Sequence, residues 1–122
     1  MANHNNVGSW GERIAMEYLL RQGYIIRERN WRLNKLEVDI IAEYNNRIIV
    51  VEVKTRTTDF VDPLRAVDKR KQRFLINAGR GYLEFYNISR ELQFDVITII
   101  GTPEKYEIEH IPDAFLPKLR TY

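Results

Sequence analysis

The sequence has 122 residues, of which 44% are hydrophobic and 30% are charged, and these proportions are typical of one globular domain. It contains no cysteine, which excludes disulfides, cysteine-ligated metal sites and thiol catalysis. Its apolar runs are only as long as strands, and residues 1–6 lack a basic region followed by an apolar core. We therefore expect one domain over residues 1–122, with a tail over residues 1–7, no membrane span and a cytoplasmic location.

The net charge is +2, but the basic residues are concentrated in two segments. Residues 65–80 carry a net charge of +5 and residues 27–35 carry +3, which leaves −6 for the rest of the chain. A basic face opposite an acidic remainder is typical of a protein that binds a polyanion beside a group of carboxylates. Two solvated surfaces are the alternative explanation of the same pattern.

The N-terminal segment predicts a helix followed by a strand. A helix over about residues 8–22 has an apolar stripe at helical spacing. Gly23 can adopt the left-handed conformation that ends such a helix. Residues 24–32 then favour an extended strand, in which Tyr24 and Trp31 are expected to be core residues.

The next segment predicts a β-hairpin. Residues 37–43 and 47–54 are rich in β-forming residues and flank the turn-forming pair Asn45 and Asn46. With these two asparagines at the centre of the turn, the numbers of facing residues sum to 91. One face of the hairpin is then wholly apolar, and its members are Val38, Ile40, Ala42, Ile49, Val51 and Val53.

The second half predicts a loop, a helix, two strands and a short helix. The polar residues 55–62 are expected to form a mobile loop, and Asp62 with Pro63 is a helix-start signal. The helix after it has one apolar side, formed by Val67, Phe74, Leu75, Ala78 and Tyr82, although Gly79 and Gly81 weaken its second half. Strands over 92–100 and 106–110 and a helix from Pro112 complete the chain. The order αβββαββα predicts an α/β fold, a mixed sheet flanked by helices.

The charged end of the hairpin is the candidate site. The register places Asp39 opposite Glu52, with Lys54 two residues further along the same strand face. Two carboxylates about 5 Å apart repel by roughly 3 kcal/mol at an effective dielectric constant of 20. A Mg²⁺ ion between them reverses the sign, because carboxylate oxygens are ligands that it prefers. The ammonium group of Lys54 could stabilise a phosphoryl transition state or orient an attacking water.

A structural explanation of the same pattern is also open. The register places Glu37 opposite Lys54, where the two could form a cross-strand ion pair, with Asp39 and Glu52 at a solvated sheet edge. A longer turn or a bulge would place the charged pairs on opposite faces.

At this point the sequence resembles known proteins. Asp39, followed across the hairpin by Glu52, Val53 and Lys54, resembles the PD-(D/E)xK signature of restriction-endonuclease-like nucleases. A longer ordered set over residues 8–100 resembles the YraN-like family of small, uncharacterised bacterial proteins. Its motifs here are Gly11-Glu12, Gly23-Tyr24, Arg29-Asn30-Trp31-Arg32, Glu37-Val38-Asp39-Ile40-Ile41-Ala42, Val51-Glu52-Val53-Lys54-Thr55-Arg56, Ala66-Val67 and Lys71.

This resemblance implies a restriction-endonuclease-like fold, related to archaeal Holliday-junction resolvases, and DNA cleavage that depends on Mg²⁺ or Mn²⁺. By position, Asp39 and Glu52 would bind the metal, Lys54 would assist the attacking water, and Glu12 would approach from the first helix. Leu36 stands where the family usually has glycine. Because resolvase-like relatives act as symmetric dimers, the resemblance also implies a homodimer.

Further residues are candidates on their position alone. Glu12 lies at the edge of the first helix's apolar stripe, as a helix-terminus group or as a site carboxylate. Lys71 lies within the second helix's apolar stripe, as a phosphate contact or as a rim lysine with an exposed ammonium group. The other candidates are Arg32, Arg56, Arg70 and Gln72 as nucleic-acid contacts, with a solvent-facing position as the alternative for Gln72, and Glu37 as an accessory residue.

Two polar residues of the last strands are given structural roles. Asp95 interrupts the apolar strand 92–100 and needs a partner if it is buried. We expect a salt bridge from Asp95 to an arginine of the second helix, and we expect His110 to be a surface residue.

The sequence supports three functional hypotheses. The first is a metal-dependent nuclease that hydrolyses DNA phosphodiester bonds, on branched or single-stranded substrates. The second is a nucleic-acid-binding module on the same fold that does not cut, and it predicts salt-sensitive binding without turnover. The third is a structural or protein-interaction domain.

Overall fold

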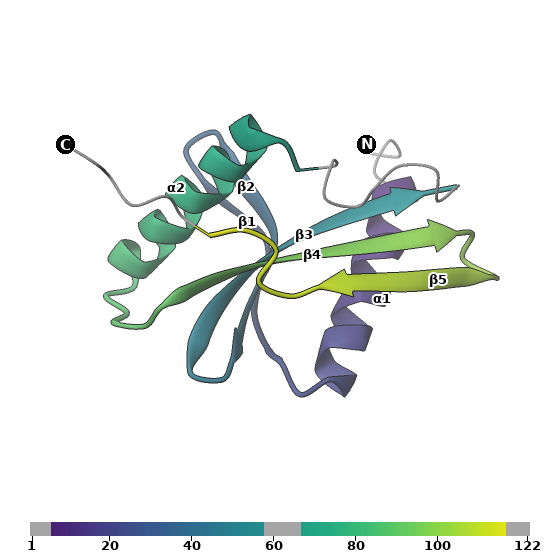
Figure 1. Ribbon diagram of the computed structural model, residues 1–122, viewed down its shortest axis with the longest axis horizontal. Helices are drawn as coiled ribbons and strands as arrows, with labels where there is room; N and C mark the ends of the chain where they lie inside the picture. The colour runs from purple at the N-terminus through teal and green to yellow at the C-terminus, as the bar shows by residue number, and fades with distance from the viewer. Residues whose placement is uncertain (1–5, 58–66, 117–122) are drawn as a thin grey trace.

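The computed structural model describes residues 6–57 and 67–116 of the chain (Figure 1). Five strands form one mixed sheet in the order β1-β2-β3-β4-β5, and only β3 and β4 are parallel neighbours. The helices and strands, in chain order, are α1 (Asn6–Arg21), β1 (Ile25–Leu33), β2 (Leu36–Tyr44), β3 (Arg47–Arg56), α2 (Lys69–Phe85), β4 (Leu92–Gly101) and β5 (Tyr106–Ile111). The predicted α/β class, with a mixed sheet flanked by helices, is therefore confirmed.

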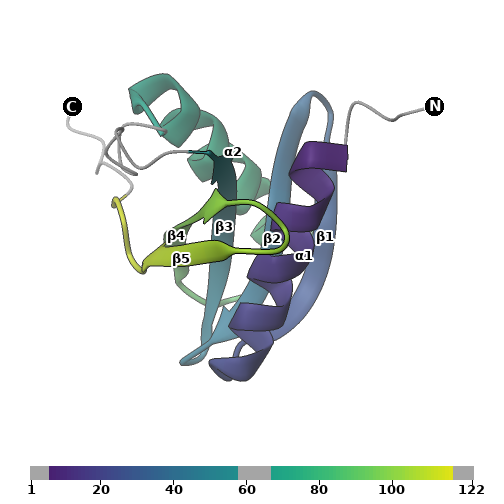
Figure 2. The same ribbon diagram turned by 90° about the vertical axis from the view of Figure 1, so that its right-hand side faces the viewer.

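The two helices cover opposite faces of the sheet and give the domain two cores (Figure 2). On one face, Ile14, Ala15 and Leu19 of α1 pack against the sheet. On the other face, Leu75 and Tyr82 of α2 are buried with residues of β2, β3 and β4. Within the described residues, neither helix is long and apolar enough to cross a membrane.

Helix α1 ends as the sequence predicts but begins earlier. Gly23 has a φ of 95°, and the amide of Tyr24 donates a hydrogen bond of 2.9 Å to the carbonyl of Leu19, which closes the last turn. The helix begins at Asn6, so the last two residues of the predicted tail 1–7 are helical. The rest of that tail lies outside the described residues.

The hairpin of β2 and β3 has the predicted turn. Asn45 and Asn46 have φ values of 52° and 61°, which is the conformation of the two central residues of a type I′ turn. Tyr44 faces Arg47, and the predicted register holds as far as the pair Ile40 and Val51.

One residue of the predicted apolar face lies on the other side of the sheet. Ile40, Ala42, Ile49, Val51 and Val53 are buried under α1 as predicted, but Val38 is buried under α2. On the N-terminal side of Ile40, strand β2 pairs only with β1. A two-stranded ribbon twists more strongly than a wider sheet, and this twist carries Val38 to the opposite core.

Helix α2 begins later than the sequence predicts. Asp68 is its N-cap residue and accepts a hydrogen bond of 2.8 Å from the amide of Lys71, so the helix begins at Lys69. Asp62 and Pro63, the predicted start, lie outside the described residues.

The apolar side of α2 is confirmed with one exception. Val67, Leu75, Ala78 and Tyr82 are buried, whereas Phe74 is 43% exposed and contacts the guanidinium group of Arg70. The two glycines of α2 permit close packing. A Cβ atom at Gly79 would lie 3.1 Å from the side chain of Val50, and one at Gly81 would collide with Leu33.

The remaining differences concern loops and the C-terminus. Thr55 and Arg56, assigned to the predicted loop 55–62, belong to β3, and residues 58–62 lie outside the described part of the chain. Strands β4 and β5 occupy their predicted places. The helix predicted from Pro112 is absent from residues 112–116, and the residues beyond 116 lie outside the described part.

Candidate active site

The site lies where the sheet divides. Strands β2 and β3 stop pairing after Ile40 and Val51, and from there β2 continues only with β1 while β3 continues only with β4. Where the backbone pairing of β2 with β3 ends, the carboxylate of Asp39 provides the next hydrogen-bond acceptor. Its Oδ2 accepts a hydrogen bond of 2.8 Å from the amide of Val53. The last predicted pairs of the hairpin therefore do not form as backbone pairs, although Asp39 and Glu52 still meet.

Asp39 and Glu52 form a pair of acids in which Glu52 is buried and Asp39 is half-buried. The side chain of Glu52 is 4% exposed. Burial, followed by the neighbouring charge of Glu52, raises the pKa of Asp39 to about 7. The backbone hydrogen bond from Val53 and the more distant charge of Glu12 are smaller influences on the same pKa. Below pH 7 the pair thus tends to hold a proton, because two adjacent buried carboxylates resist double ionisation.

Two lysines contact the same oxygen of Glu52. Lys54 Nζ lies 3.4 Å from Glu52 Oε2, and Lys71 Nζ of α2 lies 3.5 Å from it. Both lysine side chains are more than one third exposed, so their ammonium groups remain open to solvent. The position of Lys71 within an apolar stripe, noted in the sequence, places it over the carboxylate pair.

Glu12 reaches the site from the other face of the sheet. Burial raises its pKa, and the charges of Glu37 and Glu52 contribute, while a hydrogen bond with Asn30 and the charge of Arg29 oppose the rise. A Cβ atom at Gly11 would collide with Thr55 Oγ1. Gly11 therefore allows α1 to approach β3 closely, and this approach brings the next residue, Glu12, to the divided end of the sheet.

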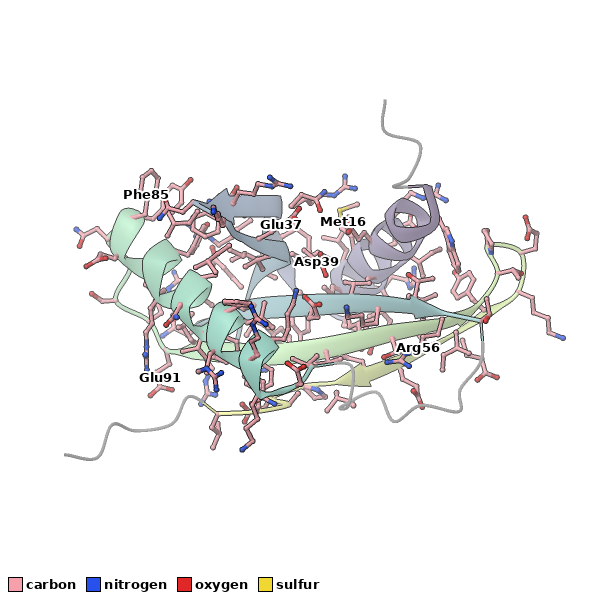
Figure 3. The ribbon with its side chains drawn as sticks, turned by 90° about the horizontal axis from the view of Figure 1, so that it is seen from above. Met16, Glu37, Asp39, Arg56, Phe85 and Glu91 are labelled. Carbon is pink, nitrogen blue, oxygen red and sulfur yellow. The ribbon has the colours of Figure 1, made fainter. Side chains whose placement is uncertain are left out.

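The predicted accessory residue Glu37 does not pair with Lys54. Its Oε1 lies 3.5 Å from Arg32 Nη2 on the exposed end of the β1–β2 hairpin. Lys54 contacts Glu52 instead, so the cross-strand ion pair of the structural explanation is not formed. Figure 3 shows Glu37 and Asp39 in the region between the two helices, with Arg56 toward the far end of β3.

The other predicted nucleic-acid contacts are spread around the site. Arg56 lies two residues beyond Lys54 on the same face of β3, and its Nε is buried without a hydrogen-bond partner among the described residues. Arg70 lies over the ring of Phe74. Gln72 donates a hydrogen bond of 3.0 Å to the carbonyl of Val67. Of the predicted contacts on α2, only Lys71 faces the carboxylates.

The donor set fits a hard divalent cation. Within the described ranges, no group of three acidic or histidine side chains is close enough to form a preassembled metal cage. Asp39, which is half-buried, and Glu52, which is buried, provide a pair of neighbouring carboxylates. Mg²⁺ is commonly bound by one or two carboxylates, with water and substrate phosphates completing its octahedral shell. The two acids thus suit Mg²⁺ or Mn²⁺ better than zinc, which favours four fixed protein ligands in structural sites.

Comparison with known proteins identifies a family. The family described as "Uncharacterised protein family UPF0102" matches residues 11–99. A UPF0102 protein of Bacteroides fragilis is 46% identical over 120 residues, covering 98% of this chain and 99% of the relative. Similar proteins of Phocaeicola vulgatus and Flavobacterium psychrophilum are 45% and 40% identical, and they cover 98% and 94% of this chain and 99% and 98% of their own lengths. The chain belongs to the UPF0102 family. The predicted resemblance to uncharacterised small bacterial proteins is confirmed.

The UPF0102 chain also contains a second buried polar cluster, centred on Asp95, whose partners the sequence did not reveal. Oδ2 of Asp95 lies 2.7 Å from His110 Nε2 and accepts a hydrogen bond of 3.0 Å from the hydroxyl of Tyr24. Its Oδ1 accepts hydrogen bonds from Gln93 Nε2 and from the amide of Asp113. Burial alone would raise the pKa of Asp95, but the hydrogen bonds from His110, Gln93 and Asp113 outweigh it and lower the pKa.

Both expectations for this cluster are wrong. Asp95 pairs with His110 and not with an arginine of α2, and the side chain of His110 is only 10% exposed. Tyr18 Oη lies 3.0 Å from the other ring nitrogen of His110. These hydrogen bonds connect α1, β4 and β5, and both oxygens of the Asp95 carboxylate accept them, which indicates a structural role. Alternation along β5 places His110 on the same face as the partly buried Ile108, and this signal could have predicted its burial.

Proposed function

We propose that this protein is a cytoplasmic, divalent-metal-dependent nuclease that hydrolyses DNA phosphodiester bonds at the divided end of its sheet. The observation that carries the proposal is the pair formed by the half-buried Asp39 and the buried Glu52, with two lysine ammonium groups beside it. An acid whose pKa is raised by burial and by a neighbouring carboxylate, as that of Asp39 is, is costly for a purely structural strand. Cation binding and phosphoryl chemistry explain the combination.

In this proposal Asp39 and Glu52 hold Mg²⁺ or Mn²⁺. When bound, the ion would supply positive charge that stabilises the phosphate in the transition state and would favour ionisation of the attacking water. The fixed position of Asp39 follows from its hydrogen bond with the Val53 amide, which prevents its carboxylate from rotating away. The binding of the cation requires Asp39 in its ionised form, so metal affinity rises with pH through the region of its raised pKa.

Lys54 orients the attacking water and stabilises the charge that develops on the phosphate. It is suited to both tasks because its ammonium group is held next to Glu52 and remains exposed to an incoming strand. Hydrolysis forms a bond from the water oxygen to phosphorus and breaks the bond from phosphorus to the leaving sugar oxygen, and the proton that the water loses is balanced by the proton that the leaving oxygen gains. Glu12 can accept a hydrogen bond from the attacking water, and Lys71 can contact a nonbridging phosphate oxygen.

The test is cleavage of labelled duplex, single-stranded, flap and four-way-junction DNA with Mg²⁺ or Mn²⁺. We expect cutting by the wild-type protein and by Lys105→Ala, whose lysine is exposed in the turn between β4 and β5. We expect at least a 100-fold loss for Lys54→Ala and for Glu52→Gln. Cleavage by both variants at the wild-type rate would refute the assignment. Salt-sensitive binding of DNA without any cutting would instead favour the non-cleaving binding module.

The assembly state is a further part of the proposal. The resemblance to resolvases implies a homodimer, in which two sites could act on two strands of one substrate. Sedimentation velocity at micromolar concentration, with and without a four-way junction, tests this proposal. A monomer in both conditions would remove it without affecting the metal site.

A further inference from the structure

A groove runs along the side of α2 that faces away from the carboxylate pair. It has a volume of about 430 Å³, and its walls are a stripe of α2 and the chain that follows β5. Lys69, Arg73, Ile76 and Arg80 line it from the helix, at successive spacings of three or four residues that share one helical face. Lys71 lies about 160° around the helix from Arg73, because residues two apart differ by about 200°. The groove and the candidate active site are therefore on different sides of α2.

Within residues 6–57 and 67–116, the cations of this groove have no acidic neighbour that neutralises them. Among the described residues, no carboxylate lies within ion-pair distance of Lys69, Arg73 or Arg80. By contrast, Arg27 and Arg90 are both paired with Glu43. The described lining of the groove also contains no acidic residue. Three cations along one wall, with no carboxylate partner in the described part of the chain, favour an anionic ligand.

The spacing of these three cations matches a ligand that carries several negative charges along its length. With a rise of 1.5 Å per residue, Lys69 and Arg73 are about 6 Å apart along the helix axis, and Arg73 and Arg80 are about 10 Å apart. All three side chains are exposed. A single compact anion could contact one or two of them, whereas an extended polyanion can contact all three.

The opposite wall is apolar and well anchored. Phe115 stacks on the buried ring of Phe94, with ring centroids 5.0 Å apart and planes 19° apart. The neighbouring amide of Ala114 donates a hydrogen bond of 2.7 Å to the carbonyl of Phe94. Leu116, at the end of this wall, is 71% exposed. Figure 1 shows the segment after β5 passing beside α2.

We propose that this groove binds a segment of single-stranded nucleic acid. A basic wall facing aromatic and aliphatic side chains matches a strand whose phosphates and unpaired bases point to opposite sides. The amide groups of Gln72 and Asn77 also line the groove and can hydrogen-bond to base edges. A duplex would leave the apolar wall unused, since its bases are stacked inside. The groove does not depend on the proposed cleavage, because neither Asp39 nor Glu52 belongs to it.

The experiment is fluorescence anisotropy with a labelled 12-nucleotide oligo(dT) and a matched duplex, with EDTA present so that no metal-dependent cutting occurs. The test variant is Arg73→Ala/Arg80→Ala. The matched control is Arg21→Ala/Lys105→Ala, which removes the same charge from exposed positions elsewhere. We expect the test variant to lose at least tenfold in affinity for oligo(dT), and the control to lose less than threefold. The slope of log K against log salt should fall by about 1.4 in the test variant, because single strands contribute about 0.7 for each phosphate contact.

A second variant tests the contribution of the apolar wall to affinity separately from the contribution of charge. Leu116→Ser should weaken binding of oligo(dT) by about threefold with an unchanged salt slope, because it removes no charge. Equal affinity of the test and control variants, tighter binding of the duplex than of oligo(dT), or equally strong competition by polyglutamate would each overturn the proposal. If the wild-type protein cuts no DNA but the groove variants still lose oligo(dT) affinity, the groove stands and the nuclease proposal fails.

Discussion

Replacing Asp39 by asparagine should stabilise the metal-free protein at alkaline pH. The folded-state pKa of Asp39 is raised from 3.8 to about 7, so ionising this residue costs free energy in the folded protein that it does not cost in the unfolded chain. The sign follows directly. The contribution of Asp39 to stability is fully present below about pH 4 and is lost as the pH rises through 7. Asparagine carries no charge at any pH and retains an oxygen that can accept the hydrogen bond from the Val53 amide.

The size of the effect follows from the same shift. A rise of about three pKa units corresponds to about 4 kcal/mol at 1.36 kcal/mol per unit. Relaxation of the pair and water entering the ionised site reduce this figure, so we expect about 1 to 3 kcal/mol in favour of Asp39→Asn at pH 8. At pH 4 the two proteins should unfold at the same urea concentration.

The assay is urea unfolding by circular dichroism in EDTA at pH 4, 6 and 8. Glu104→Gln, at an exposed position in the turn between β4 and β5, is the control for removing one acid, and it should leave the pH dependence unchanged. Glu52→Gln should stabilise at pH 8 as well, and the double variant should add less than the sum, because one repulsion is removed in both. If Asp39→Asn is less stable than the wild type at pH 8, the repulsion between the two acids is not the dominant influence on this site.

Three further outcomes test the fold. Leu75→Ala should destabilise by about 2 to 5 kcal/mol, whereas Phe74→Ser should change stability by less than about 0.5 kcal/mol, because only Leu75 is buried; urea unfolding of the two variants decides. His110→Phe should cost about 2 to 4 kcal/mol, since it leaves the buried carboxylate of Asp95 without its closest partner, and a value near zero in thermal unfolding would contradict that role. Asn46→Gly should raise the melting temperature by a few degrees, because the φ of 61° at this position is strained for asparagine and free for glycine.

The sequence predicts the hairpin well because its signals are local. The turn at Asn45 and Asn46 and the alternation of apolar residues determine the register without reference to the rest of the chain. The same local rules fail at Val38, because the strong twist of β1 and β2 depends on where β2 leaves β3. The division of the sheet depends on how strands β1 to β4 pair with one another, and the sequence of a single strand does not predict it.

The start of α2 and the partner of Asp95 show two other limits. Asp62-Pro63 and Asp68 are both acceptable N-cap signals, and capping chemistry alone does not choose between them. For Asp95, the need for a partner is evident from the apolar residues around it. The identity of that partner depends on the pairing of β4 with β5, which places Ile97 beside His110, and this is a long-range fact.

The candidate site combines both kinds of information. Asp39, Glu52 and Lys54 come from one hairpin, and their proximity follows from the turn. Glu12 and Lys71 come from helices on opposite faces of the sheet, and in the sequence they are marked only as charges at the edge or in the middle of apolar stripes. Such misplaced charges are informative because a charge on an apolar face needs a partner there. Arg70 and Gln72, which neighbour Lys71 in sequence, lack this mark and face elsewhere.

Folding alone does not explain why two acids lie where the sheet divides. The backbone of β3 needs an acceptor for the Val53 amide where β2 departs, and Asp39 provides it. Asparagine would provide the same acceptor without repelling Glu52, so the hydrogen bond explains a polar side chain at this position but not an acid. The second acid, Glu52, has both Lys54 and Lys71 beside it, so two carboxylates adjoin two ammonium groups, and such a site offers ligands to a cation and to an anion side by side. A metal ion beside a phosphate group is such a pair of ligands, and this supports the proposed nuclease function over a purely structural strand.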